Sequence, residues 1–154
     1  AVFNHGIIQQ IDPAITLYEE PANAFVAGFI GESNSLSGTV EQLNGKHCVV
    51  RLESDARVTA CAANLSGTGT RTVLSIRPER VLLGAAASAC ENRFSATLKE
   101  MIYLGDQIRA RLDLPGTANV MAKTSVAHWD GRLRIGDRID VGFPVENLRA
   151  LEPM

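Results

Sequence analysis

The segment Leu36-Ser37-Gly38-Thr39-Val40 occurs a second time along the chain, in altered form, as Phe94-Ser95-Ala96-Thr97-Leu98. Two further pairs follow in the same order: Val50-Arg51-Leu52-Glu53 with Ala110-Arg111-Leu112-Asp113, and Val58-Thr59-Ala60 with Val120-Met121-Ala122. These segments alternate apolar and polar residues, which is typical of strands with one buried face. The repetition predicts two similar β units, at about residues 36–83 and 92–150.

The ends of the two units also correspond. A strand at Thr72–Ile76 runs into Arg77-Pro78-Glu79, and a strand at Arg138–Val141 runs into Phe143-Pro144-Val145-Glu146. Alternation alone is common to all β units and leaves a chance likeness open. The shared order of a Ser-x-Thr strand, an Arg-Leu-acid strand end and a Pro-acid exit favours a true duplication. We expect the halves to share strands, because sharing removes exposed sheet edges.

Short alternating segments separated by Gly, Asn and Asp continue through the rest of the chain. The predicted strands are Ser37–Leu43, Cys48–Leu52, Arg57–Ala62, Thr72–Ile76, Phe94–Ile102, Gln107–Leu112, Asn119–Thr124 and Arg138–Phe143. About eight short strands at regular spacing predict a mainly β fold, a barrel or sandwich. Gly84–Ala89 is interpreted as a loop or a helical turn.

Residues 1–31 have a different pattern. Val2-Phe3 and Ile7-Ile8 flank a tight turn and predict a small hairpin. Asp12-Pro13 predicts a helix start with Asp as the cap, and Glu20-Pro21 ends that helix. Apolar residues at helical spacing predict a second helix over Ala22–Ile30.

The apolar stripes of these two helices have nothing before them in the chain to cover them. We expect them to form the end of a larger preceding domain, with Leu17, Tyr18, Phe25 and Phe29 packing against it. Residues 32–35 are small and polar and are interpreted as a linker. Residues 36–154 would then form the β domain.

The composition excludes several classes of function. The 154 residues carry a net charge of -2 and 5% aromatics, which gives neither a basic footprint nor stacking platforms for nucleic acid. The longest apolar stretch, Val81–Ala87, is interrupted by Gly84 and falls short of the roughly 20 residues that span a bilayer. Cys48, Cys61 and Cys90 are far apart and are interpreted as free thiols in a reducing cytoplasm. No His or Cys spacing typical of zinc occurs, so no metal site is expected.

Two segments superficially resemble nucleotide-binding motifs. Gly45-Lys46 lacks the first glycine and the final hydroxyl of a phosphate loop, and Asn44-Gly45 is interpreted as a hairpin turn. Leu65-Ser66-Gly67-Thr68-Gly69 is followed by a strand where a helix would be needed, so we interpret it as a loop. No catalytic or cofactor-binding set is expected in these residues.

Residues 1–31 resemble the end of the nucleotide-binding domain of ABC-importer ATPases. The resemblance rests on Val2-Phe3-x-x-Gly6-x-Ile8-x-Gln10 and on Leu17-Tyr18-x-x-Pro21-Ala22-Asn23-x-Phe25-Val26-Ala27-x-Phe29-Ile30-Gly31. Glu32-Ser33-Asn34 is similar to the spermidine/putrescine branch. The remainder resembles the regulatory TOBE domain of those ATPases, an OB-like fold. Its matching segments are Ile76-Arg77-Pro78-Glu79, Tyr103-Leu104-Gly105-Asp106, Gly136-Asp137-x-Ile139 and Pro144-x-Glu146.

The resemblance implies a parent protein that binds ATP and Mg²⁺, hydrolyses ATP, pairs as a homodimer and drives membrane permease subunits from the cytoplasmic face. The motifs that bind ATP would lie upstream of Ala1. The present residues would then regulate the ATPase and stabilise its dimer. Phe143 stands where the family often has Trp, and the transported molecule is left open.

Two alternative functions are left open. Related duplicated barrels bind oxyanions through backbone N–H groups and Ser, Thr or Lys side chains. The available residues of these types are Ser37, Thr39, Ser95, Thr97 and Lys123. An OB-type nucleic-acid binder is the other alternative, against which the charge and the low aromatic content speak.

Overall fold

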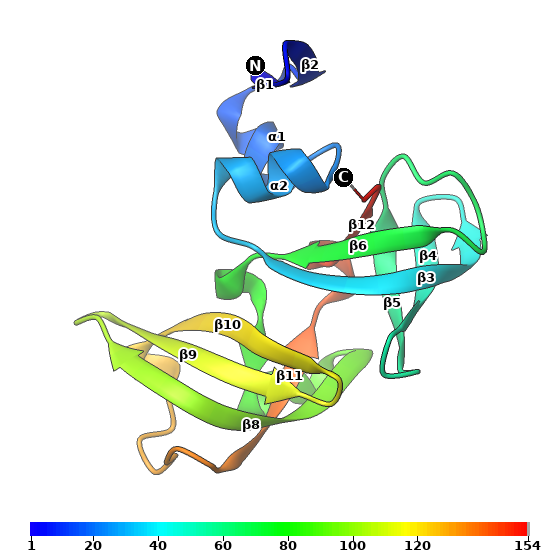
Figure 1. The fold of residues 1–154 in the computed structure, drawn as a ribbon. Coiled ribbons are helices and arrows are strands. Elements are labelled where there is room, and N and C mark those ends of the chain that lie inside the picture. The colour runs from blue at the N-terminus through cyan, green and yellow to red at the C-terminus, as the bar shows by residue number, and fades with distance from the viewer. Residues whose placement is uncertain (154) are drawn as a thin grey trace.

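Both predicted β units are present in the computed structural model, which describes residues 1–153, and each forms a strongly curved sheet (Figure 1). The first contains β3 (Asn34–Asn44), β4 (His47–Leu52), β5 (Arg57–Ala62) and β6 (Arg71–Ile76), closed into a barrel by β12 (Arg149–Leu151). The second contains β8 (Asn92–Tyr103), β9 (Gln107–Leu114), β10 (Thr117–Ser125), β11 (Arg138–Phe143) and β7 (Leu82–Leu83). The mainly β, duplicated fold is therefore confirmed.

The two halves exchange their last strands. β7 follows the first half in the chain but pairs with β11 of the second, through Leu83 opposite Val141. β12 follows the second half but pairs with β5 and β6 of the first, through Arg149 opposite Cys61 and Ser75. Each exchanged strand covers an edge that would otherwise expose unpaired backbone groups. The predicted sharing of strands is confirmed.

The duplication extends to the irregularities of the sheets. The pairing of β3 with β4 shifts register between Val40 and Gln42, and that of β8 with β9 shifts between Leu98 and Glu100. Val40 and Leu98 end the repeated segments that identified the two units. A β-bulge bends its strand sharply, and here it helps each sheet to curl.

A single core joins the halves, because the inward residues of both sheets belong to one cluster of buried apolar side chains. Leu74 of β6, Leu98 of β8 and Phe143 of β11 are among its largest fully buried members. Burying such a side chain contributes about 1.5–3 kcal/mol to folding. The two halves are therefore expected to unfold together.

Short 3-10 helices connect the strands: η1 (Pro78–Arg80), η2 (Gly84–Ala89), η3 (Val126–His128) and η4 (Val145–Asn147). The helical turn considered for Gly84–Ala89 is thus present. η1 and η4 occupy equivalent places, since each follows the fourth strand of its half. β3 begins at Asn34, inside the segment interpreted as a linker.

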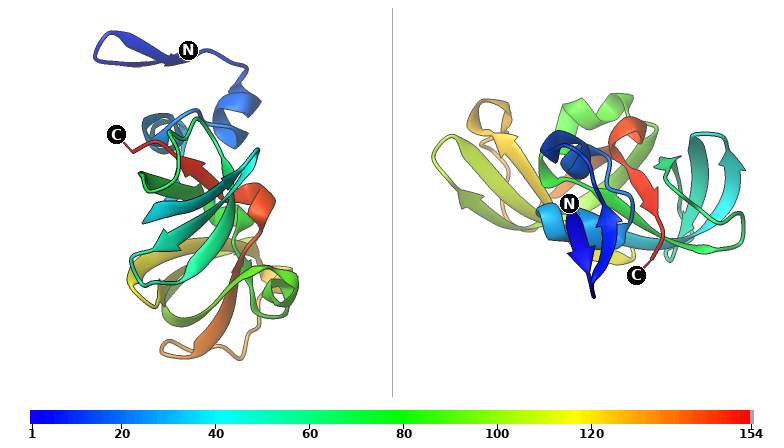
Figure 2. Two further views of the ribbon diagram at one scale, coloured as in Figure 1. Left: turned by 90° about the vertical axis from the view of Figure 1, so that its right-hand side faces the viewer. Right: turned by 90° about the horizontal axis from the view of Figure 1, so that it is seen from above.

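The N-terminal residues form the predicted hairpin, β1 (Val2–Asn4) and β2 (Ile7–Gln10), and two helices, α1 (Ala14–Glu19) and α2 (Ala24–Ile30). Figures 1 and 2 place them at one end of the molecule, with the second half at the other. No helix in the described part of the chain is long and apolar enough to cross a membrane.

One predicted cap is wrong. Pro13 rather than Asp12 occupies the N-cap position of α1, so no side chain caps that helix, and Asp12 accepts a hydrogen bond from Gln10. Asn23 caps α2, with its Oδ1 accepting from the N–H of Val26 at 3.0 Å. The second helix consequently begins at Ala24, two residues later than predicted.

Candidate functional site

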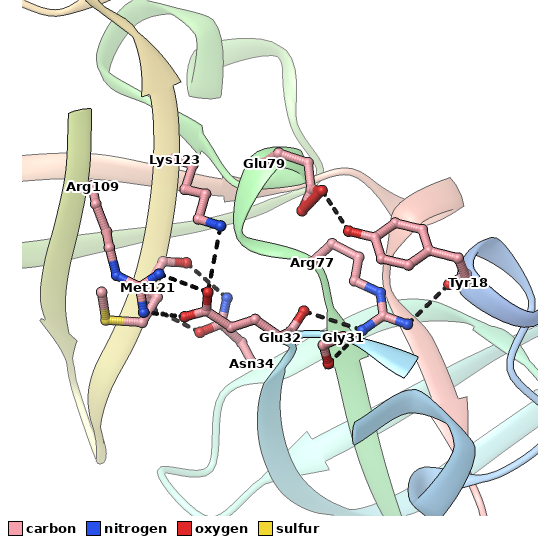
Figure 3. Close-up of polar contacts among 9 residues, drawn as sticks. All are labelled: Tyr18, Gly31, Glu32, Asn34, Arg77, Glu79, Arg109, Met121 and Lys123. Atoms are coloured by element: carbon pink, nitrogen blue, oxygen red, sulfur yellow. Dashed lines mark hydrogen bonds and ion pairs between the residues drawn. The ribbon is translucent and has the colours of Figure 1, made fainter. Parts of the chain in front are cut away.

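The side chain of Arg77 connects both helices to the first barrel (Figure 3). It follows β6 directly, and only 6% of the residue is exposed. Its Nη1 donates to the carbonyl oxygens of Ala27 at 2.8 Å, Gly31 at 3.0 Å and Glu32 at 3.1 Å. Its Nη2 donates to the carbonyl of Tyr18 at 3.0 Å. A single guanidinium thus binds carbonyls near the C-terminal ends of α1 and α2, where helices leave such groups unpaired.

The side chain of Tyr18 makes two further contacts with the same segment. Its ring lies under the Arg77 guanidinium, with 4.2 Å between the guanidinium carbon and the ring centroid. Its hydroxyl donates to Glu79 of η1 at 2.5 Å. Burial and the neighbouring Glu79 carboxylate raise the pKa of Tyr18 to about 12, so the hydroxyl remains a donor at neutral pH. The α1 helix is therefore bound to two neighbouring positions of one short segment.

Glu32 connects the same region to the second half. Its carboxylate accepts two hydrogen bonds from Arg109 of β9, one of them at 2.6 Å, and lies 3.5 Å from the ammonium of Lys123 on β10. Arg109 and Lys123 are direct cross-strand partners. The hydrogen bonds from Arg109 hold the pKa of Glu32 below its ordinary value. Because its carbonyl binds Arg77 and its carboxylate binds β9 and β10, Glu32 spans the two halves.

Two asparagines join the halves reciprocally. The side chain of Asn34, at the start of β3, donates to the carbonyl of Met121 at 2.8 Å and accepts from its N–H at 2.7 Å. The side chain of Asn92, at the start of β8, donates to the carbonyl of Thr59 and accepts from its N–H, both at 2.8 Å. Thr59 and Met121 are the middle residues of a repeated segment pair. Each half therefore inserts an equivalent amide into the third strand of the other.

We call Tyr18, Glu32, Asn34, Arg77, Glu79, Arg109 and Lys123 the junction. Apart from the neutral amide hydrogen bonds of Asn34, its contacts are charge-assisted hydrogen bonds to main-chain carbonyls and carboxylates, which are short and directional. They fix the positions of the helices relative to both halves.

The structure gathers only part of the residues that the sequence singled out. Arg77 and Glu79 lie in the junction, and Pro78 is buried at the start of η1. The other family segment, Tyr103-Leu104-Gly105-Asp106, turns the chain between β8 and β9, with Tyr103 and Leu104 exposed.

The four residues expected to face a further domain differ in their surroundings, and the side chain of Tyr18 contacts Arg77 and Glu79 of this chain. Leu17 is buried among Val2 and Val26 of this chain, and Phe25 packs against the same cluster. Phe25 stacks on Phe29 with 5.7 Å between ring centroids, and Phe29 is 64% exposed. Packing against a further domain stays a prediction, for which Phe29 offers the open apolar surface.

Sequence reasoning missed the roles of Glu32, Asn34 and Arg109, and considered Lys123 only as an available residue for the alternative oxyanion site. Glu32 and Asn34 fell in the polar stretch interpreted as a linker. One signal was present. Asn34 and Asn92 each lie two positions before their repeated segment, with Ser35 and Arg93 respectively in between. Extending the repeat by those positions would have aligned the two amides.

The two segments that superficially resemble nucleotide-binding motifs do not adopt the structure of those motifs. Asn44 and His47 are paired across the β3–β4 hairpin, with Gly45 and Lys46 as its turn, so this segment cannot open a phosphate-binding helix. Leu65–Gly69 is a loop before β6, as predicted. Any bound nucleotide would need residues other than these.

Comparison with known proteins gives three findings. A family model described as "TOBE domain" matches residues 74–151. The spermidine/putrescine import ATP-binding protein PotA of Rubrobacter xylanophilus is 35% identical over 145 residues, which are 93% of this chain and 38% of that protein. The protein of the same name from Ruegeria pomeroyi is 33% identical over 152 residues, 98% of this chain and 40% of that protein. The chain thus spans about two fifths of the length of these relatives.

The fold is similar to that of a solved structure, the cytoplasmic molybdate-binding protein ModG with molybdate bound. The TM-score is 0.68 at 18% identity, and the match covers 78% of this chain and 96% of that one. At this identity the likeness concerns the fold alone. The fold of this chain is therefore a known β architecture.

Proposed function

The chain belongs to the TOBE domain family, and from this membership we propose that it regulates and dimerises the ATP-binding subunit of a spermidine/putrescine-type ABC importer. The similarity to the two relatives over more than nine tenths of the chain supports this assignment. Residues 1–31 would complete the ATPase domain, residues 32–35 would connect it, and residues 36–154 would form the regulatory domain. ATP and Mg²⁺ would bind in the part of the subunit that precedes this chain.

The observation that carries the proposal is the junction. In an importer, the ATPase domains open and close while their regulatory domains remain in contact. A module with this task needs a stiff connection to the ATPase domain. Arg77 would supply it from the first half, and Glu32 would supply it through its contacts with the second half. A ligand or protein that binds one conformation better would shift the equilibrium between them.

The partners follow from the same assignment. A second copy of the chain would be the dimer partner, and the membrane permease subunits would be reached through the ATPase domain. The complex would lie at the inner face of the plasma membrane, with the present residues in the cytoplasm. The transported molecule is chosen mainly by the permease, so polyamine transport rests here on the names of the relatives alone.

Truncating the full-length subunit after Ile30 tests the regulatory role. We expect the truncated subunit to bind ATP, to lose dimer stability in sedimentation velocity, and to support less spermidine uptake with its permease in proteoliposomes. Sedimentation of the 154-residue chain tests the dimer contact separately. Unchanged uptake by the truncated subunit, or a strictly monomeric chain at high concentration, would contradict the respective part.

A second candidate, small-anion sensing, is favoured by one feature of the second half. Lys123, Ser125 and His128 line a common surface pocket beside β10. No hydrogen bond or ion pair in the described chain joins any two of the five residues first considered, Ser37, Thr39, Ser95, Thr97 and Lys123. Calorimetry with molybdate, sulfate and phosphate tests this candidate. Absence of heat and of any thermal shift would remove it.

A further inference from the structure

The two halves use one equivalent place in different ways. In the second half, the cross-strand partners Arg109 and Lys123 lie beside η1 and hold the carboxylate of Glu32. By sheet register, which pairs Val40 with Val50 and Leu98 with Leu112, β9 is shifted by two residues from the repeat read in the sequence, and the corresponding cross-strand partners of the first half are His47 of β4 and Cys61 of β5. They lie beside η4, the equivalent of η1. The duplication has therefore placed an imidazole and a thiol where the other half has two cations.

A carboxylate completes this group. Glu146 of η4 places Oε1 at 3.5 Å from Nε2 of His47 and Oε2 at 3.9 Å from Sγ of Cys61. One potential ligand atom from each of the three residues lies within 4.8 Å of the other two. In a tetrahedral zinc site with bonds of about 2.0–2.3 Å, ligand atoms are roughly 3.3–3.7 Å apart. A small contraction of the side chains would therefore bring all three into bonding distance of one ion.

The backbone holds these residues in place. Ala62 donates its N–H to the carbonyl of Lys46 at 2.8 Å, which extends the β4–β5 ladder past His47 and Cys61. Cys61 itself donates its N–H to the carbonyl of Leu148 at 2.8 Å and so attaches the end of η4 to β5. Only side-chain rotations are needed to enclose an ion.

We propose that His47, Cys61 and Glu146 form a binding site for Zn²⁺. Imidazole, thiolate and carboxylate are the ligand types that zinc takes in proteins. Binding releases the thiol proton of Cys61 to solvent, and the thiolate and carboxylate then balance the two charges of the ion. His47 and Glu146 are exposed, so an ion from solution can reach the site.

Charged side chains of both signs surround the three proposed ligands. Lys46 and Arg149 line the same surface pocket and oppose a cation, whereas Glu19 and Glu20 line it and favour one. Glu19 pairs with Arg80. Three protein ligands leave the fourth position of a tetrahedral ion to water. The site would bind metal next to the C-terminal end of α1, independently of the proposed transport role.

Titration of the reduced 154-residue chain with Co²⁺ and Zn²⁺ tests the proposal. Co²⁺ takes the place of Zn²⁺ and gives a near-ultraviolet charge-transfer band only when a thiolate binds it. We expect one ion per chain, this band with Co²⁺, and its loss when Zn²⁺ is added. Cys61→Ser should abolish the band, and Glu146→Gln should weaken Zn²⁺ binding at least about 10-fold.

Cys90→Ser is the matched control, because Cys90 is another half-buried thiol that lies apart from the three ligands. It should bind both ions as the parent chain does, and circular dichroism confirms that each variant is folded. A band that survives Cys61→Ser, or that is lost in Cys90→Ser, would overturn the assignment. So would the absence of both heat and a band in the parent chain.

Discussion

Replacing Arg77 by Met removes the guanidinium of the junction and keeps an unbranched side chain. The change deletes four hydrogen bonds of 2.8–3.1 Å and the contact with the Tyr18 ring. A hydrogen bond to a charged group contributes about 1.5–3 kcal/mol, but burying the charge offsets part of that sum. Removing the donor leaves the four carbonyls without this partner, and because a buried group left unpaired costs about 1–3 kcal/mol, we expect Arg77→Met to cost about 3–5 kcal/mol.

Such a loss is large beside the stability of a typical domain, about 5–15 kcal/mol. Urea denaturation of the 154-residue chain measures it. The loss should appear first in α1 and α2, because Arg77 binds their carbonyls, and last in the core that the halves share. Hydrogen exchange should therefore accelerate at the amides of α2 more than at those of β8.

Arg80→Met is the matched control. Arg80 ends η1, three residues after Arg77, but its partner is Glu19 and its side chain is 44% exposed. An exposed ion pair contributes about 0–1 kcal/mol, so this variant should unfold close to the parent chain. If Arg77→Met came within about 1 kcal/mol of Arg80→Met, the buried guanidinium would not hold the helices in the way inferred here.

Three further predictions concern the glycines of the fold and Glu32. In Gly38→Ala the new Cβ would lie 2.5 Å from Cγ1 of Val50 and 2.7 Å from a main-chain oxygen, so urea curves should show a loss of about 1–3 kcal/mol. Gly28→Ala in α2 has no atom within 4 Å of the new Cβ and should gain about 0.5–1 kcal/mol in the same assay. The pKa of Glu32 is lowered in the folded chain, so its carboxylate contributes stability that is complete above the ordinary pKa of about 4.3 and is lost as pH falls through the lowered value. Glu32→Gln should thus be less stable than the parent at pH 7, with the difference vanishing in acid, whereas a difference independent of pH would exclude this contribution.

The sequence was sufficient for features that depend on periodicity. Alternation located the strands of both halves, and the repeat of Leu36–Val40 at Phe94–Leu98 predicted the duplication that the sheets confirm. β7 and β12 were not identified because strands of two or three residues show no period. Their exchange between halves was nevertheless expected from the cost of open sheet edges.

Contacts between side chains and backbone groups that are distant along the chain could not be predicted from the sequence. Asn34 appeared as a linker residue because nothing local indicates that its amide binds Met121, 87 positions away. Likewise His47, Cys61 and Glu146 show no metal-binding spacing, since the hairpin and η4 bring them together only in the folded chain. The prediction of no metal site rested on spacing alone and did not consider such an assembly.

The central claim of the proposed function is that Arg77 transmits motion between the ATPase domain of an importer subunit and the two β halves. It is tested most directly by counting spermidine molecules transported per ATP hydrolysed in proteoliposomes that contain the full-length subunit and its permease. We expect a lower ratio for Arg77→Met than for Arg80→Met, with ATP binding unchanged in both. An equal ratio in folded samples of both variants would contradict it.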